Sequence, residues 1–370
     1  MRTGTANLPL HGGKCPAWLF ARMKNLAAAL IEIMVLENGT EEVLRRLADP
    51  FWFQAFGCVL GFDWHSSGLT TTVTGALKEA LRDRAPDLGL FVCGGKGGTS
   101  RRTPDEIAAW GERSALTLDP GVLAFASRMA AKVDNAAVQD GYQLYHHVFA
   151  FSASGRWAVI QQGMNENTRY ARRYHWLSEG LEDFVCEPHA AVCTVVPGET
   201  VLNLVARESD GARRVSAQLA RLDPSRLCRD LARLQNDNHL ELARHHRLLL
   251  SDLDPRSVEK VLLKSYAAQP PDFLALLGIQ GVGPKAVRAL SLMAELVYGA
   301  PASCRDPARF SFAHGGKDGH PYPIDRRVYD HSVACLERAL AAARVGRTEK
   351  VSAFRRLARF QAEAPSPAAG

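Results

Sequence analysis

Patterns typical of β-strands are confined to about the first 210 residues of the chain. The alternating runs 145–151 and 156–161 flank Ser152-Ala-Ser-Gly155, which predicts a β-hairpin with a glycine-containing turn. The apolar run Leu88–Cys93 predicts a further strand, directly before a glycine-rich loop. Helical patterns cover 18–36, 40–47, 74–84 and 103–115. We therefore predict an α+β domain over residues 1–210.

Beyond about residue 215 the patterned segments have the spacing of helices. We expect helices at 215–222, 225–233, 240–250, 257–265, 271–277, 284–297, 327–343 and 350–360. The boundary is predicted near 208–211, so that an all-α domain covers residues 211–361. Residues 362–370, which are rich in Pro and Ala, are predicted to form a disordered tail.

Positive charge is concentrated in the second part of the chain. The net formal charge is +6, but residues 211–370 hold 25 Lys and Arg against 16 Asp and Glu, whereas residues 1–210 hold 20 against 23. A cationic region attracts polyanions through counterion release, so nucleic acid is the first partner to consider. The alternative is that the arginines of this region only keep the protein surface soluble and bind no partner.

Several classes of protein are disfavoured by composition. No apolar run reaches the roughly 18 residues of a membrane span, so we expect a cytoplasmic protein without membrane contact. The eight Cys include no C-x-x-C pair and are expected to be free thiols rather than zinc ligands. We predict no metal and no cofactor.

The segment Leu276–Leu290 is the most informative in the chain. A short helix is predicted to end at Gly278, a turn contains Gly281, Val282 and Gly283, and a second helix begins at Pro284. Glycines let the backbone approach a phosphate, and the amides of the following helix add a positive dipole end. The segment resembles the helix-hairpin-helix motif, which implies DNA binding by Gly281, Val282, Gly283, Lys285 and Arg288. A glycine-rich turn between two core helices is the alternative.

A wider resemblance, over most of residues 255–345, is to the helix-hairpin-helix DNA glycosylase superfamily. Gly281-Val-Gly-Pro-Lys285 matches the hairpin of that superfamily, and Pro323-Ile-Asp325 is similar to its Pro-apolar-Asp sequence. The resemblance implies that Lys285 is the amine that attacks the sugar C1′ and that Asp325 is the catalytic carboxylate. The two lie 40 residues apart, longer than the usual interval of the superfamily. A Lys285 that only contacts phosphate is equally open.

The intervening segment contains His314-Gly-Gly-Lys-Asp-Gly-His320 and Tyr322. Glycines interleaved with such side chains suit a loop that closes over an unstacked base, with Tyr322 as a stacking platform. An ordinary surface loop is the alternative.

Two further basic segments lie in the first domain. The loop Gly94–Arg102 is predicted to bind an anion, with Lys96, Arg101 and Arg102 as charge partners, or else to be a surface loop. Residues 169–176 are predicted to form a helical patch in which Arg172 and Arg173 alternate with aromatic rings. Such a patch suits stacking on unpaired bases. An aromatic core with a solvated arginine face is the alternative.

One cluster has residue types that bind divalent metals, namely Asp134, Gln139, Asp140, His146, His147 and Gln162. Adjacent residues of a strand point to opposite faces, so only one of the two His could join such a site. Satisfied structural polar groups are the preferred interpretation.

Segments along the whole first part carry a second resemblance. They are Thr5–Met23, Asp49–Thr72, Gln161–Met164 and Tyr170–Leu177. Together they are similar to an uncharacterised family of bacterial and archaeal proteins known only as a domain of unknown function, and this resemblance implies no activity.

From the hairpin we therefore predict a DNA-repair enzyme, either a DNA glycosylase or an abasic-site lyase. The alternatives are a metal-dependent nuclease with its active site in the first domain, and a non-enzymatic DNA-binding subunit. In each case DNA is the partner, with a repair helicase or nuclease as a possible second one.

Overall fold

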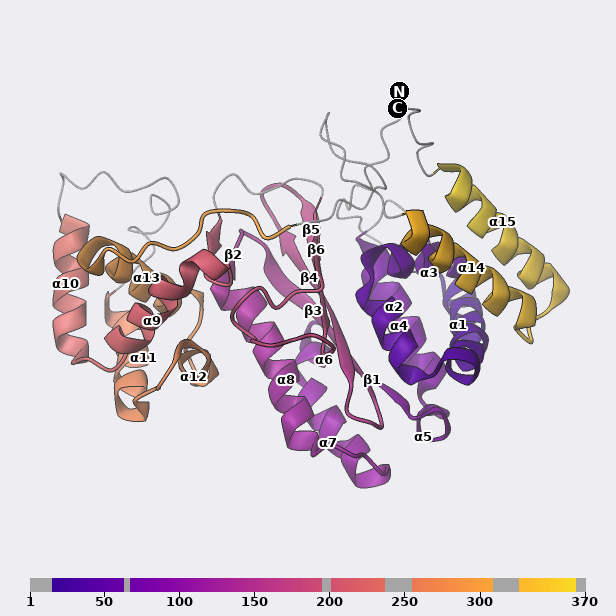
Figure 1. Ribbon diagram of the computed structural model, residues 1–370, viewed down its shortest axis with the longest axis horizontal. Helices are drawn as coiled ribbons and strands as arrows, with labels where there is room; N and C mark the ends of the chain where they lie inside the picture. The colour runs from indigo at the N-terminus through magenta and orange to yellow at the C-terminus, as the bar shows by residue number, and fades with distance from the viewer. Residues whose placement is uncertain (1–14, 63–66, 195–200, 237–254, 309–325, 364–370) are drawn as a thin grey trace.

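The chain is a mixed α/β protein built around one antiparallel sheet. The computed structural model describes residues 15–62, 67–194, 201–236, 255–308 and 326–363. Five strands pair in the order β1 (Leu90–Lys96), β3 (Gln143–Ser152), β4 (Trp157–Asn165), β5 (Tyr170–Leu177) and β6 (Ala191–Cys193). A separate two-stranded ladder joins β2 (Val138–Gln139) to β7 (Leu202–Asn203). Figure 1 shows the larger sheet in the middle of the molecule, with helices on both sides.

The predicted β-hairpin is confirmed. Strands β3 and β4 are antiparallel with Phe151 opposite Trp157, and Gly155 in the connecting turn has φ +89°. That left-handed conformation favours glycine, which explains the residue chosen at the turn. The strand predicted before the glycine-rich loop is also present, as β1.

Four helices pack on one face of the sheet. They are α1 (Ala17–Asn38), α2 (Thr40–Ala48), α3 (Pro50–Leu60) and α4 (Gly68–Leu81). Helix α3 begins where the Asp49 carboxylate accepts hydrogen bonds from the amides of Phe51 and Trp52, with Pro50 at its first position. Their apolar residues form one core with strand residues such as Val92 and Ile160.

The other face carries a second core that extends into the helical part of the chain. Strand residues such as Phe149 and Trp176 pack there against α7 (Thr103–Arg113) and α8 (Pro120–Lys132). The same core continues into α9 (Asp210–Leu219), α10 (Pro224–Asn236), α11 (Pro255–Ala268), α12 (Phe273–Gly278) and α13 (Pro284–Tyr298). Short elements fill the connections: α5 (Ala85–Leu88), α6 (Gly98–Arg101), the π-helix η1 (Val133–Ala137) and the 3-10 helix η2 (Arg207–Ser209).

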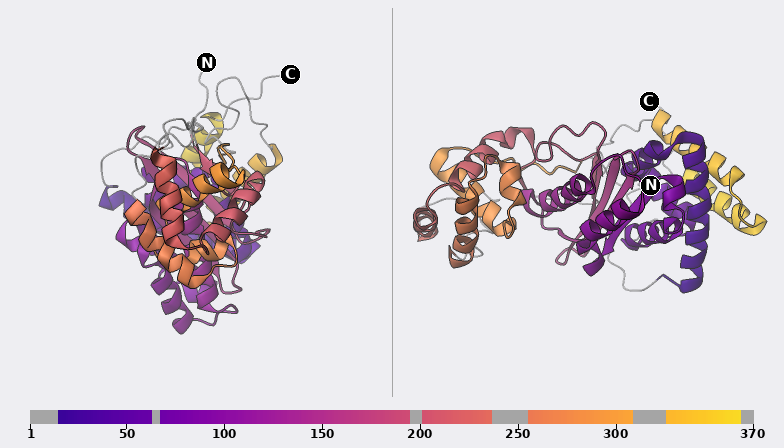
Figure 2. Two further views of the ribbon diagram at one scale, coloured as in Figure 1. Left: turned by 90° about the vertical axis from the view of Figure 1, so that its left-hand side faces the viewer. Right: turned by 90° about the horizontal axis from the view of Figure 1, so that it is seen from below.

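The last two helices depart from the predicted division at residue 210. Helices α14 (Arg326–Ala342) and α15 (Arg347–Glu363) share the core of α1–α4 through side chains such as Leu336 and Leu357. Arg356 also donates to the Val59 carbonyl at the end of α3, at 2.7 and 2.9 Å. Residues 211–361 are therefore not one continuous unit, and Figure 2 shows α9–α13 and α15 at opposite ends of the molecule. The chain returns because an apolar face of the first helices is left for it to cover.

Two further findings complete the comparison with the sequence. Residues 362 and 363 end α15, and the rest of the predicted tail lies outside the described residues. Among the helices that the structure describes, none combines the length and the hydropathy needed to cross a bilayer.

We predict that the docking of α14 contributes substantially to stability. Leu336 is fully buried, so Leu336→Ala should lower the free energy of unfolding by about 2–5 kcal/mol. The control Val351→Ala, at a position 42% exposed on α15, should change it by less than about 0.5 kcal/mol. Urea unfolding measures both. Equal effects would show that α14 does not pack on the first helices in solution.

Candidate functional site

The predicted hairpin forms a tight turn between two helices. Helix α12 is capped by Asp272, whose carboxylate accepts from the Ala275 amide at 2.7 Å, and α13 begins at Pro284. Between them Gly281 has φ +97°, a conformation that side chains rarely adopt. Val282 is 1% exposed, and its amide donates to the Ile279 carbonyl at 3.2 Å. The expected glycine turn is thus present, but the side chain of Val282, predicted to bind DNA, is buried between the helices.

Three hydrogen bonds join the hairpin and the start of α13 to the end of α8 and to β2. Lys132, at the end of α8, donates to the Val282 carbonyl at 2.7 Å, and burial lowers the pKa of this lysine. Gln139 of β2 donates to the Pro284 carbonyl at 3.0 Å and accepts from Arg288 Nε at 2.6 Å. Arg288 is half-buried. Arg288 was predicted to bind DNA, but its Nε instead stabilises the position of the hairpin.

The outer side of the hairpin is open and cationic. Gly281 and Lys285 are exposed, and Lys264 Nζ of α11 lies 3.8 Å from the position that a Cβ of Gly281 would take. The N-cap residue of α13 is Gly283, and among the described residues no side-chain cap is present at the start of this helix. Uncapped amides at a helix start favour an anion.

Asp325, the predicted catalytic partner of Lys285, lies outside the described residues, and so does Tyr322. Asp325 directly precedes α14, and α14 packs in the core of α1–α4, whereas α13 belongs to the core on the other face of the sheet. Figure 1 shows the two helices on opposite sides of the sheet. Helix α14 therefore does not pack beside the hairpin.

The segment predicted as a glycine-rich loop forms the last residues of β1 and the short helix α6, with positive φ at Gly94, Gly95 and Gly97. The Gly94 amide donates to Glu106 and its carbonyl accepts from Lys78, both at 2.8 Å. Lys96, Arg101 and Arg102 are exposed at this end of the strand, and the Lys96 ammonium lies 5.7 Å from the centre of the Tyr145 ring. The three predicted charge partners thus gather at one end of β1.

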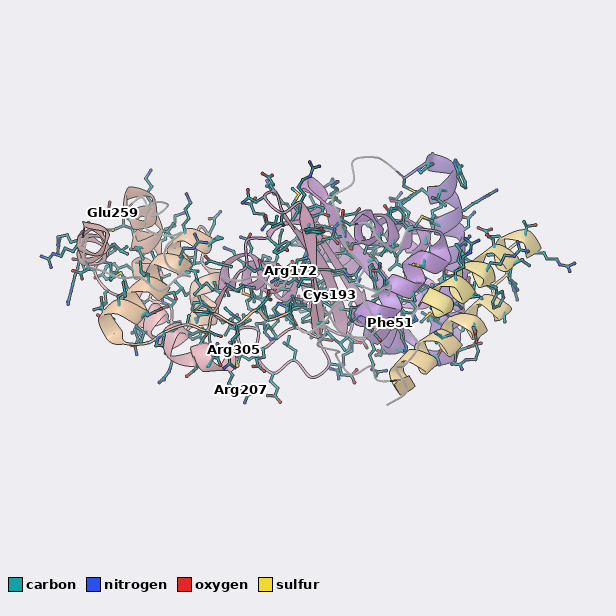
Figure 3. The ribbon with its side chains drawn as sticks, turned by 90° about the horizontal axis from the view of Figure 1, so that it is seen from above. Phe51, Arg172, Cys193, Arg207, Glu259 and Arg305 are labelled. Carbon is teal, nitrogen blue, oxygen red and sulfur yellow. The ribbon has the colours of Figure 1, made fainter. Side chains whose placement is uncertain are left out.

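The prediction for Arg172 and Arg173 is wrong. Residues 170–177 form strand β5 rather than a helix, and both side chains are fully buried. Arg172 binds Asp140 at 2.7 Å and grips Asp306 with two bonds of 2.7 and 3.0 Å, near the middle of the molecule (Figure 3). Arg173 donates to the Gln54 side chain at 3.1 Å, and burial lowers its pKa to about 10. Neither arginine is accessible to a polyanion in this structure.

The predicted metal-type cluster is divided between the two faces of the sheet. His146 Nε2 lies 2.9 Å from Thr74 Oγ1 of α4, whereas His147 Nε2 lies 2.8 Å from Ser127 Oγ of α8. Gln162 is on the His146 face and donates to the Ser67 carbonyl at 2.9 Å. Within the ranges that the structure describes, no three metal-ligating side chains gather at one point.

On the other face, a chain of hydrogen bonds leads to Asp134. Ser127 donates to His147 Nε2, and His147 Nδ1 donates to Gln161 Oε1 at 2.9 Å. Gln161 then donates to Asp134 at 2.6 Å, and Trp176 adds a bond of 2.9 Å to the same oxygen. Gln161 and Trp176 both donate to Oδ2 of Asp134, so this oxygen acts as an acceptor.

The second oxygen of Asp134 contacts His189 Nε2. An ionised Asp134 accepts from Nε2 of His189, and in that tautomer Nδ1 is the basic nitrogen. His189 lines a cleft of about 220 Å³ together with Asn203, Ser303 and Arg305. A histidine held in this way by a carboxylate has the arrangement of a general base. The pairing of Asp134 with His189 was not predicted, because the two residues are 55 positions apart in the sequence.

We predict a pH signature from this network. Burial lowers the pKa of His147 from 6.5 to about 4, so in this interval the unfolded chain binds a proton that the folded protein does not. Stability should therefore fall as the pH is lowered from 6.5 towards 4, by about 1.4 kcal/mol per pH unit from this group. His147→Gln should make the slope shallower in urea unfolding at several pH values. An unchanged slope would mean that His147 is not buried in the neutral form.

Comparison with known proteins places the chain in a family without giving an activity. No curated protein and no solved structure matches it. One family model matches residues 4–324, which include the sheet, the Asp134 network and the hairpin. The match covers well over half of the chain, and the protein therefore belongs to the family described as "Protein of unknown function (DUF763)".

Proposed function

We propose that this protein binds DNA and acts in DNA repair, with the hairpin at 279–283 gripping the phosphate backbone. The observation that carries the proposal is the open start of α13, where Gly283 leaves the first amides without a side-chain cap. Exposed Lys264 and Lys285 flank the same point and supply positive charge. Amides and cations of this kind hold phosphate without reading sequence.

The enzymatic form of the proposal is base excision or abasic-site cleavage at Lys285. Its exposed amine attacks C1′ of an abasic sugar, water leaves, and an imine joins the protein to DNA. The resemblance to the DNA glycosylase superfamily supports this role for Lys285 and a catalytic role for Asp325. The position of α14 gives no support to that pairing.

A second candidate, hydrolysis of a phosphodiester, is favoured by His189. Its Nδ1 can take a proton from an attacking water, and the charge that results on the ring is stabilised by Asp134. This reaction leaves no covalent adduct between protein and DNA. A non-enzymatic DNA-binding subunit is the third form, and it predicts binding without any turnover.

We predict that Gly283→Ala weakens binding to duplex DNA without loss of the fold. Gly283 has φ −138°, and a Cβ there would make an ordinary contact of 3.9 Å with the Gly281 carbonyl oxygen, so Ala fits the backbone but places a methyl group where a phosphate would approach. Fluorescence anisotropy with a duplex of random sequence should show at least a fivefold weaker affinity. Wild-type affinity should fall steeply with salt, with a slope of about −0.9 per phosphate contacted.

The matched control is Gly346→Ala, at a glycine between α14 and α15 where an added Cβ would meet no described atom within 4 Å. Gly281→Ala is a poorer test, because its φ of +97° makes the substitution strained. If the folded Gly283→Ala protein binds duplex DNA like the control, the hairpin does not grip phosphate.

We predict that Lys285 forms the imine with abasic DNA. Borohydride reduces an imine to a stable amine, so a covalent adduct should appear with the wild-type protein and vanish with Lys285→Gln. The matched control is Lys264→Gln, which removes the neighbouring charge and should weaken binding but retain the adduct. An adduct that survives in Lys285→Gln would assign the amine to another residue. Strand cleavage without an adduct would favour His189.

A further inference from the structure

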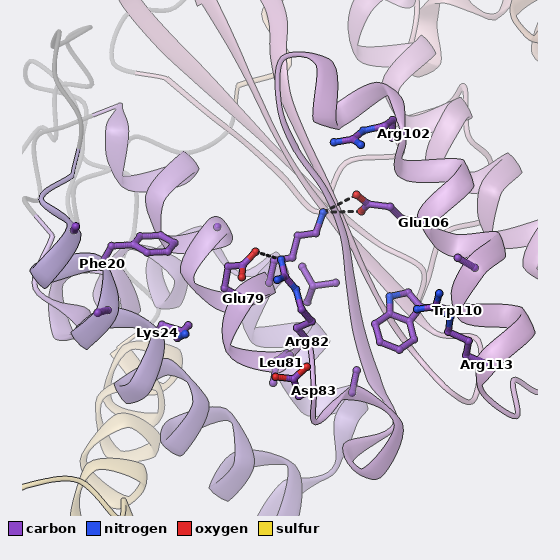
Figure 4. A pocket seen from close by; sticks show the side chains of 17 residues that line it. Phe20, Lys24, Glu79, Leu81, Arg82, Asp83, Arg102, Glu106, Trp110 and Arg113 are labelled. Carbon is purple, nitrogen blue, oxygen red and sulfur yellow. Dashed lines mark hydrogen bonds and ion pairs between the residues drawn. The ribbon is translucent and has the colours of Figure 1, made fainter.

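A wide cleft opens between the first helices and α7, away from the hairpin. Its volume is about 950 Å³, near the upper end of the roughly 300–1,000 Å³ usual for small-molecule sites. The walls are formed by α1 and α4 on one side and α7 on the other (Figure 4), and Val92 of β1 also lines the cleft. The cleft has room for more than one nucleotide.

Cations outnumber carboxylates on the walls. Lining residues include five Lys and Arg and three Asp and Glu. Two of the cations are neutralised, because Lys78 pairs with Glu106 at 2.7 Å and Arg82 pairs with Glu79. The remaining Lys24, Arg102 and Arg113 form no ion pair with any residue that the structure describes. Only Asp83 is left to oppose these three charges.

Aromatic rings stand on both walls. Phe20 of α1 and Trp110 of α7 line the cleft from opposite sides, and each is half-buried (Figure 4). Trp110 is held by Phe91, at 5.1 Å between ring centres. Rings interleaved with unpaired cations are the arrangement on which single-stranded nucleic acid binds, since every base offers a face for stacking.

The cleft also runs beside the outer edge of the sheet, and an extended acidic peptide that adds as a strand is the competing ligand. Strand β1 is at the edge, and only its inner side pairs with β3. At Gly94, however, the outward amide and carbonyl are already bound by Glu106 and Lys78. This ion pair closes the edge at that point, which favours nucleic acid over an added peptide strand.

We propose that this cleft binds single-stranded DNA, with Lys24, Arg102 and Arg113 on phosphates and Phe20 and Trp110 on bases. The proposal deepens the proposed function and rests on it for the choice of DNA as the ligand. The loop with Lys96 and Arg101 directly precedes Arg102 and extends the cationic surface. The hairpin grips the backbone of a duplex, and the cleft takes a strand that has left the duplex.

The test is fluorescence anisotropy with a labelled 15-residue oligo-dT. The double variant Arg102→Ala, Arg113→Ala should bind at least tenfold more weakly at low salt, with a salt slope smaller by about 1.4, because about 0.7 is lost per phosphate contact. Trp110→Leu should bind at least about fivefold more weakly through lost stacking. The control Arg355→Ala, at an exposed arginine of α15, should bind like wild type.

Wild-type affinity in the double variant overturns the proposal. Displacement of oligo-dT by polyglutamate at equal charge concentration also overturns it, and assigns the cleft to an acidic peptide. Gly283→Ala separates this proposal from that of the hairpin. It should lower duplex binding and leave oligo-dT binding unchanged, whereas the arginine pair should do the reverse. If only one of the two variants lacks its expected effect on binding, the site that carries that variant is the one that is misassigned.

Discussion

Two buried carboxylates on one short segment join η1 and β2 to the five-stranded sheet. Asp134 lies in η1 and Asp140 lies just after β2, and both are enclosed by protein. Asp134 receives hydrogen bonds from β4, from β5 and from His189, and Asp140 receives them from Arg172 and Tyr174 of β5. Removing one partner of such a buried pair leaves an uncompensated charge, at a cost of about 3–5 kcal/mol. The position of η1 and β2 against the sheet depends on these bonds.

The same segment determines where the candidate sites lie. Gln139, between the two carboxylates, binds the start of α13, and Lys132, just before η1, binds the turn. The hairpin is thus attached to the elements that orient His189. The residues that bind a ligand at the hairpin are therefore supported by the sheet, and a functional site requires such a rigid support.

What the sequence predicted well depended on local chemistry. Gly155 and Gly281 have positive φ that their own turns require, so neighbouring residues are sufficient evidence for them. The arginines of β5 were misread, because a strand buried on both faces shows no alternation of polar and apolar residues. Their partners Asp140, Asp306 and Gln54 are distant in sequence, as are the residues that α14 covers. Only the folded chain shows these pairings.

The central claim is that phosphate occupies the open start of α13, and amide hydrogen exchange tests it most directly. Exchange should be compared with and without a duplex of random sequence, in peptides that cover residues 279–288 and in peptides from α15. The account predicts that DNA slows exchange in the hairpin peptides and leaves those from α15 unchanged. DNA binding with no slowing between 279 and 288 would contradict it.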